Sequence, residues 1–139
     1  YGAGKGNPSD KTAIGTVNYN RGIVGGIMMV EAIRVAQGKF GKKALNGDEV
    51  RWGLENLNLS QDRLKTLGVA NMIPAVKTSC ANHEGSGYTH FMQWDGKAWK
   101  PVSNWIAPDN AVLDPLIKAS SAKYAQEKNI KPRDCSKEQ

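Results

Sequence analysis

Three side chains suited to ligand recognition stand side by side ahead of a long apolar run. Tyr19, Asn20 and Arg21 supply an aromatic ring, an amide and a guanidinium, and residues 22–30 after them are almost all small or apolar. An aromatic ring packs on apolar ligand surface, and a guanidinium holds a carboxylate through two hydrogen bonds. A helix that begins here would add N–H groups that favour an anion. The alternative is a rim position for Tyr19 and a surface ion pair for Arg21.

A second group of reactive side chains lies in the middle of the chain. Cys80, His83, Glu84 and His90 have the spacing Cys-x2-His-x6-His, which matches no standard zinc site and lacks a fourth ligand. Cys80 with His83 and Glu84 also suggests a nucleophile beside an acid–base pair, but no orienting third group accompanies them. We therefore expect a structural loop here, with no metal, no cofactor and no catalytic residue. The protein is expected not to be an enzyme.

The elements that must position these side chains follow from hydrophobic periodicity and chain breakers. A short strand is predicted over residues 14–19, followed by a helix that Asn20 caps and Gly38 stops. The apolar face of this helix is broad enough to predict burial against several strands. That face contains Ile23, Ile27, Val30 and Ile33.

Three further helices and one hairpin are predicted downstream. The helices are expected to open at Asn46, at Ser60 and at the pair Asp114-Pro115. The hairpin is expected to turn on two residues, Asp95-Gly96, with Trp94 and Trp99 paired across it. This order of elements belongs to an α/β protein, but its strands are too few to cover so apolar a first helix. We expect partner strands outside this chain.

Composition narrows the class of protein. The 139 residues are 40% hydrophobic and 23% charged, which is ordinary for one soluble domain. The net charge of +6 is scattered without a basic stripe, which favours a solvated surface over nucleic-acid binding. The start lacks both a signal peptide and an initiator Met, which predicts a processed chain or a fragment. Cys80 and Cys135 fit one disulfide in an exported protein and two free thiols in a cytosolic one equally well.

Five segments in series carry a resemblance to a known family. They are NYNRGIVGGIMMVEAI, LNGDEVRWGLENL, SCANHEGSG, QWDGKAWKPVSNWI and KYAQEKNIKPRDC. Together they resemble the C-terminal part of periplasmic substrate-binding proteins of ABC transporters, of the branched-chain amino acid (Leu/Ile/Val) type. The resemblance implies an α/β, partial type I periplasmic-binding-protein fold with three-layer α/β/α lobes, incomplete in this chain. Residues 1–89 would belong to the N-terminal lobe, and residues 90–139 would form the hinge crossover, hairpin and tail helix of the C-terminal lobe.

The resemblance also implies a function, partners and a compartment. The expected function is solute capture in the periplasm: an interlobe cleft binds a branched-chain or apolar amino acid, or an aromatic acid, and delivers it to an inner-membrane ABC permease. Tyr19 takes the position of a ligand contact, with Asn20 and Arg21 beside it, and Cys80 pairs with Cys135. The remainder of the same protein is a further expected partner. The rivals from other classes are a small basic nucleic-acid-binding module and a self-associating interaction domain.

Overall fold

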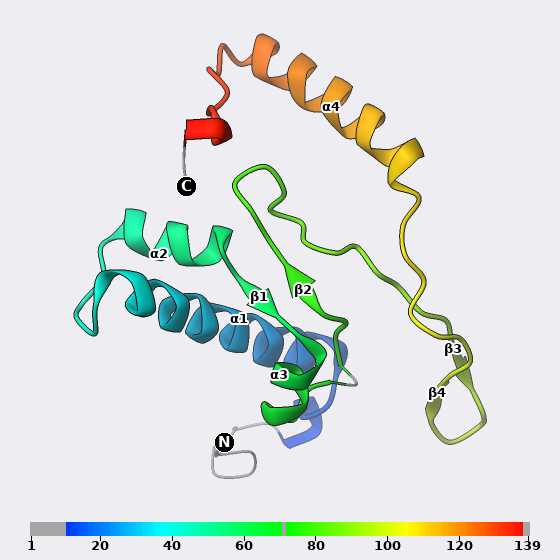
Figure 1. Ribbon diagram of the computed structural model, residues 1–139. Coiled ribbons are helices and arrows are strands. Elements are labelled where there is room, and N and C mark those ends of the chain that lie inside the picture. Colours follow the sequence, from blue (N-terminus) through cyan, green and yellow to red (C-terminus); the bar gives the residue numbers. More distant parts are fainter. Residues whose placement is uncertain (1–10, 71, 138–139) are drawn as a thin grey trace.

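The computed structural model describes residues 11–70 and 72–137. Two helices packed side by side and a two-stranded sheet form its body, while a hairpin and the last helix stand away from that body (Figure 1). The elements in chain order are η1 (Lys11–Ala13), α1 (Val17–Phe40), α2 (Gly47–Glu55), β1 (Asn58–Leu59), α3 (Gln61–Thr66), β2 (Val76–Lys77), β3 (Met92–Trp94), β4 (Trp99–Pro101), α4 (Asn110–Glu127) and η2 (Cys135–Lys137).

Helix α1 begins earlier than the sequence predicts. Thr16 is its N-cap, and the Thr16 hydroxyl accepts a hydrogen bond from the backbone N–H of Tyr19 at 3.4 Å. The predicted strand over residues 14–19 and the predicted cap at Asn20 are therefore wrong. Threonine and asparagine are both good capping residues, and here the earlier of the two starts the helix.

Glycine and capping residues set the end of α1 and the starts of α2 and α3. Helix α1 runs through the predicted stop at Gly38 and ends at Gly41, whose φ of 91° leaves the helical region. The predicted starts at Asn46 and Ser60 are confirmed. Asn46 and Glu49 form a reciprocal capping box, with both hydrogen bonds at 2.9 Å, and the Ser60 hydroxyl accepts from the N–H three residues later at 3.2 Å.

The hairpin forms as predicted, but on a longer turn. Strands β3 and β4 are antiparallel with Trp94 opposite Trp99, and the two ring centroids are 5.8 Å apart, which confirms their pairing. The two-residue turn is wrong, because four residues, 95–98, connect the strands. Asp95 Oδ1 accepts hydrogen bonds from the N–H groups of Lys97 and Ala98 at 2.9 and 2.8 Å and so stabilises the wider loop.

Helix α4 also begins earlier than predicted. Asp109 caps it by accepting a hydrogen bond from the Ala111 N–H at 3.1 Å, so the start predicted at Asp114-Pro115 is wrong. Pro115 instead lies inside the helix, where its ring removes one backbone donor. No residue of α4 is buried.

The sheets are small and separate from each other. Strand β1 pairs only with β2, with Leu59 opposite Val76, and β3 pairs with β4. Within residues 11–70 and 72–137 no three-layer α/β/α lobe forms from these elements alone. The partial type I fold and the division at residues 1–89 and 90–139 stay predictions.

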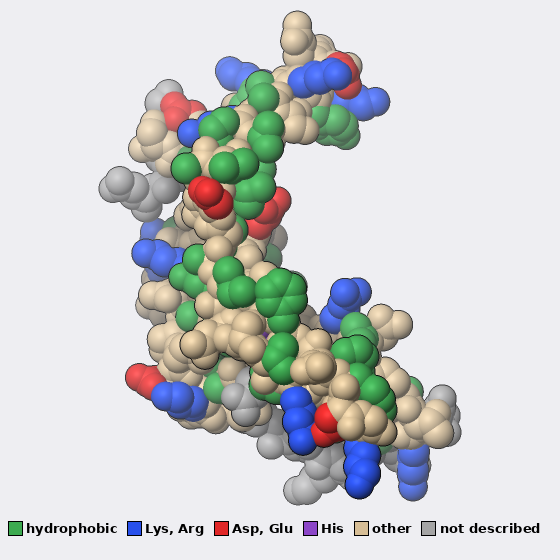
Figure 2. All heavy atoms as spheres, turned by 90° about the vertical axis from the view of Figure 1, so that its right-hand side faces the viewer, with side chains coloured by type: hydrophobic (Ala, Val, Ile, Leu, Met, Phe, Trp, Pro, Cys, Tyr) green, Lys and Arg blue, Asp and Glu red, His purple; other side chains and the backbone are tan. Residues whose placement is uncertain are grey.

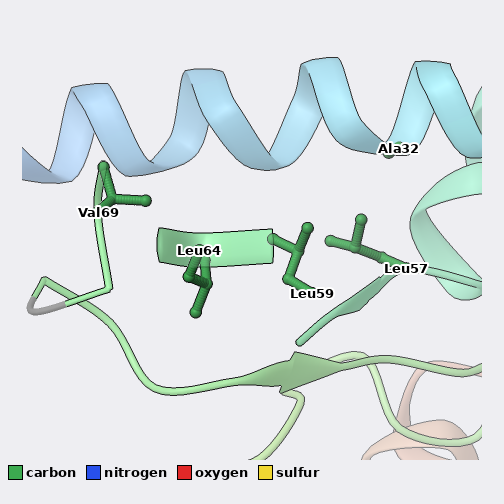
Figure 3. Packing of buried hydrophobic residues seen from close by; sticks show 5 residues of the cluster. All are labelled: Ala32, Leu57, Leu59, Leu64 and Val69. Carbon is green, nitrogen blue, oxygen red and sulfur yellow. The ribbon is translucent and has the colours of Figure 1, made fainter. Parts of the chain in front are cut away.

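A compact core sits between α1 and the segment that follows α2. The core consists of one residue of α1 and four from the segment after α2: Ala32, Leu57, Leu59, Leu64 and Val69 (Figure 3). Helices α1 and α2 pack tightly at Gly53, where an added Cβ would collide with the Ala32 carbonyl oxygen and approach Ala36 Cβ to 2.9 Å. Glycine is required at this crossing because any side chain would push the helices apart.

The core covers only part of the apolar face predicted for α1: Ile27 packs against it and Ile33 is half-buried. Ile23 and Val30 expose 40% and 63% of their surface, while the residues that α1 buries are Glu31, Ala32 and Ala36. The described part of this chain therefore buries only one portion of the predicted face, and Ile23 and Val30 are left exposed. The helix has a second apolar side that faces solvent.

The whole chain exposes more surface than a folded monomer of its size. Its accessible surface is 10768 Å². A monomeric protein of 15.1 kDa has about 7,100 Å² by the scaling of area with mass, so the excess is about 3,700 Å². Much of the exposed apolar surface belongs to α4 and the hairpin, and Figure 2 shows hydrophobic side chains running along the face that carries them.

Candidate functional site

The predicted ligand-contact residues lie in the first turns of α1. Tyr19 exposes 36% of its surface and Arg21 is exposed, while the Asn20 side chain donates to the Gly15 carbonyl at 3.3 Å. The backbone N–H groups of Tyr19 and Asn20 both bond to Thr16, at 3.4 and 2.9 Å. These two donors are therefore engaged by the cap instead of facing an anion. A ligand role for Tyr19, Asn20 and Arg21 stays a prediction.

A buried carboxylate holds α1 against α3. Glu31 exposes only 2% of its surface. Arg63 donates to both of its oxygens, at 3.0 and 2.6 Å, and Arg34 donates twice to Oε2, at 3.0 and 2.8 Å. The hydrogen bonds from Arg63, helped by those from Arg34 and opposed by burial, lower the pKa of Glu31 to about 2. Glu31 is thus a structural anion that stays ionised.

A second buried carboxylate lies where α2 ends. Glu55 exposes 7% of its surface, and Arg133 donates to its Oε2 at 2.7 Å. His83 Nε2 lies 3.3 Å from the other oxygen, Oε1, which is buried without a hydrogen-bond partner. The hydrogen bond from Arg133 is the main reason that the pKa of Glu55 is lowered, against the opposing effect of burial. This ion pair joins the C-terminal tail to α2.

A disulfide fastens the same tail. Cys80 and Cys135 are bonded with an Sγ–Sγ distance of 2.03 Å, which confirms the pairing that the resemblance implied. Arg133 also donates to Cys80 Sγ at 2.7 Å, so one guanidinium bridges the disulfide and the buried Glu55. Because its sulfur is in the disulfide, Cys80 cannot act as a thiolate nucleophile or metal ligand. Across the part of the chain that the structure describes, no group of three or more His, Cys, Asp or Glu could hold a metal ion.

The aromatic and histidine side chains of this region make structural contacts. The His90 ring stacks on Trp105 with centroids 4.1 Å apart, and Trp52 meets Phe40 edge to face at 5.4 Å. The Lys39 ammonium lies 4.2 Å from the centre of the Trp52 ring. These contacts account for side chains that would otherwise suggest stacking on a ligand.

Two shallow hollows lie near these groups, and both are small. One, of about 190 Å³, lies beside the disulfide and is lined by Trp52, Glu55, Asn56, Ser79, Cys80, Ala81 and Cys135. The other, of about 260 Å³, is lined by Gln61, Pro74, Ala75, Ser86, Tyr88 and Trp105. Small-molecule sites usually enclose about 300–1,000 Å³, so neither hollow is a complete ligand site. Tyr19, Asn20 and Arg21 line neither of them.

The dominant surface features are apolar faces. On α4 the exposed apolar side chains recur at helical spacing and are Val112, Leu113, Leu116, Ile117 and Tyr124. On the hairpin and its flanks they are Phe91, Met92, Trp94, Trp99 and Val102. Soluble monomers rarely expose this much contiguous apolar surface unless another polypeptide, a ligand or a membrane covers it. Every helix in residues 11–70 and 72–137 falls short of the length and apolarity that crossing a bilayer requires.

Comparison with known proteins gives one informative relative. No protein-family model and no curated protein matches the sequence. A solved structure described as the crystal structure of an ABC transporter permease from the Pseudomonas fluorescens group matches with a TM-score of 0.83 and 50% sequence identity. The match covers 91% of this chain and 31% of that chain, so this chain spans about a third of its relative.

This finding links the chain to ABC transport and corrects the expected role. The relative is named a permease and not a substrate-binding protein, so the resemblance to periplasmic substrate-binding proteins was wrong. Solute capture and delivery to a separate permease is overturned with it. The buried acids Glu31 and Glu55 were missed at the sequence level, although a glutamate inside the apolar run around residue 31 is a signal for a buried ion pair.

Proposed function

We propose that this chain is one part of an ABC transporter component, of the permease kind that the solved relative is named as. The observation that carries the proposal is 50% identity over 91% of the chain, at a TM-score of 0.83. Because the chain spans 31% of that relative, the transport activity belongs to a longer protein. This part contributes packing surfaces to it and performs no catalysis.

The arrangement of the buried charged side chains supports a structural role for this part of the protein. Each buried acid is matched by an arginine from a distant element: Glu31 by Arg63 of α3, and Glu55 by Arg133 of the tail. Removing one partner of a buried pair leaves an uncompensated charge, so such pairs fix how elements sit together. Both pairs serve to lock the short core and the tail in place.

The large exposed surface supports the proposal that this chain is part of a longer protein. An excess of about 3,700 Å² over a monomer of this mass exceeds the roughly 800 Å² that each partner contributes to a standard interface. In the proposal the apolar faces of α1, α4 and the hairpin pack against the rest of the longer protein. The disulfide supports placing this part in an oxidising compartment, which in a Gram-negative cell is the periplasm.

Purification of the native-length protein from source-cell membranes tests the proposal. An antibody raised against this chain is used to isolate the protein in mild detergent, and ATP hydrolysis by the isolate is measured. The proposal predicts that an ATPase subunit with a phosphate-binding loop co-purifies and that the hydrolysis is inhibited by vanadate. The control is the same purification with antibody saturated beforehand by the free 139-residue chain. An isolate that retains the protein but hydrolyses no more ATP than this control contradicts the proposal.

A further inference from the structure

The disulfide between Cys80 and Cys135 can be reached from solvent. Both cysteines are half-buried, and both line the hollow of about 190 Å³ beside α2. A thiolate that reaches a disulfide can attack either sulfur, and the sulfur that better carries negative charge leaves faster. The charges beside each sulfur therefore decide how this bond exchanges with an external thiol.

A guanidinium contacts one of the two sulfurs. Arg133 Nη2 donates to Cys80 Sγ at 2.7 Å and to Glu55 Oε2 at 2.7 Å. The Glu55 carboxylate also interacts with Arg51, whose charge helps the hydrogen bond from Arg133 to lower the pKa of Glu55. Glu55 thus divides its negative charge between two cations, and the pair that Arg51 makes with the exposed Asp48, at 3.5 Å, is weak. A thiolate at Cys80 would lie directly beside a guanidinium, which favours it.

The charge next to the other sulfur is negative. Asp134 precedes Cys135 in the chain, and its Oδ1 accepts hydrogen bonds from the N–H and the hydroxyl of Ser136, at 3.1 and 2.6 Å. These bonds hold the carboxylate beside the short turn η2, which begins at Cys135. A nearby carboxylate disfavours a thiolate. The surroundings therefore make Cys80 the better leaving group and Cys135 the worse one.

We infer that the Cys80–Cys135 bond is a thiol-exchange site, at which an external thiolate attacks Cys135 Sγ and Cys80 leaves as a thiolate beside Arg133. A bond forms between the external sulfur and Cys135 Sγ, the Cys80–Cys135 bond breaks, and its electron pair passes to Cys80 Sγ. With a dithiol as reductant, the second thiolate of the dithiol then attacks its own sulfur in the mixed disulfide. The dithiol is oxidised to a disulfide, and Cys135 is released as the second thiolate. The inference does not depend on the role in transport.

The contact between the tail and α2 does not depend on the disulfide alone. Arg133 is bonded to Glu55, whose side chain is 8% exposed, so an ion pair remains when the sulfur–sulfur bond opens. It keeps the segment that carries Cys135 close to Cys80, and the bond can form again when the reductant is removed. A thiol oxidoreductase is the class of partner that such reversible exchange fits.

Trapping of the mixed disulfide tests the inference. The native-length protein is treated for short times with 2-mercaptoethanol, a small thiol with no second charged group, and the reaction is stopped with iodoacetamide. Peptide mass spectrometry then locates the mercaptoethanol and the alkylated thiol. The expected result is mercaptoethanol on Cys135 with alkylation on Cys80, in roughly fivefold or greater excess over the reverse arrangement.

Two variants are expected to change this ratio in opposite directions. Arg133→Gln removes the guanidinium, so the preference for Cys135 is expected to fall to about even. Glu55→Gln leaves the guanidinium without its 2.7 Å carboxylate partner, so the preference is expected to rise. A tail that is merely loosened exchanges faster in both variants, and its ratio does not move in opposite directions.

The unmodified protein decides the question even where a variant does not fold. Mercaptoethanol chiefly on Cys80 would show that Arg133 attracts the incoming thiolate instead of stabilising the leaving one, and this overturns the inference. Equal labelling of both cysteines, or an unchanged ratio in Arg133→Gln, overturns it as well. Co-purification of an ATPase has no bearing on this ratio, so the proposed function and the exchange site can fail separately.

Discussion

Replacement of Glu31 by glutamine tests whether the buried ion pair holds α1 against α3. The amide keeps the size of the side chain but loses the charge that Arg63 and Arg34 surround. The pKa of Glu31 is lowered from 4.5 to about 2. At about 1.4 kcal/mol per pKa unit this shift corresponds to about 3 kcal/mol of stability at neutral pH. Because the Arg34 side chain is 57% exposed, solvent screening reduces the expected loss to about 2 kcal/mol.

The sign of the pH dependence follows from the direction of the shift. Glu31 has a folded-state pKa below its unfolded value, so its contribution is complete above about pH 4.5 and disappears as the pH falls toward about 2. Urea denaturation followed by tryptophan fluorescence measures the free energy of unfolding at pH 7 and near pH 2. Glu31→Gln is expected to be less stable at pH 7 and to approach the unmodified protein at low pH.

The exposed Glu84 provides the matched control, because Glu84→Gln removes a charge without disturbing a buried pair. Equal free energies of unfolding for Glu31→Gln and Glu84→Gln at pH 7 would show that the Glu31 pair does not stabilise the fold. A constant difference between Glu31→Gln and the unmodified protein across the pH range would refute the assigned pKa.

Two further changes test the tail and the helix crossing. Reduction of the Cys80–Cys135 bond, whose cysteines are 55 positions apart, is expected to lower the free energy of unfolding by about 4 kcal/mol by the loop-entropy relation. An unchanged urea midpoint after addition of dithiothreitol would contradict this. Two reactive thiols in unfolded, unreduced protein would contradict the disulfide itself. Gly53→Ala is expected to destabilise the protein by about 1–3 kcal/mol because the new methyl group meets the Ala32 carbonyl. Gly38→Ala, with open space around its Cβ, is its control and is expected to be neutral or to stabilise α1 by up to about 1 kcal/mol. Equal thermal midpoints for the two alanine variants would show that α1 and α2 do not cross closely at residue 53.

The parts of the fold that local chemistry decides were predicted from the sequence. Asn46 and Ser60 cap their helices through contacts within three residues, and Trp94 pairs with Trp99 across a short loop. The errors arose where two local signals competed. Thr16 and Asn20 both cap well, and neighbours that the sequence does not reveal decide between them.

The candidate site depended on contacts that the sequence does not reveal. Glu31 is paired with an arginine 32 positions away, and Glu55 with one 78 positions away. The Cys80–Cys135 pair was reached through the resemblance, because two cysteines alone left free thiols equally open. The functional role was misassigned because the five matching segments contain caps, glycines and turns, which specify where helices and strands end. Such features do not report which component of a transport system a polypeptide forms.

The most direct test of the central claim is the intact mass of the polypeptide that carries this sequence in the source cell. The claim is that the open faces of α1, α4 and the hairpin are covered by further polypeptide of a longer ABC transport component. It predicts a mass of roughly 45 kDa, from the 15.1 kDa of this chain and its share of the solved relative, which is also within the size of a two-domain protein. A native polypeptide of 15.1 kDa would contradict it.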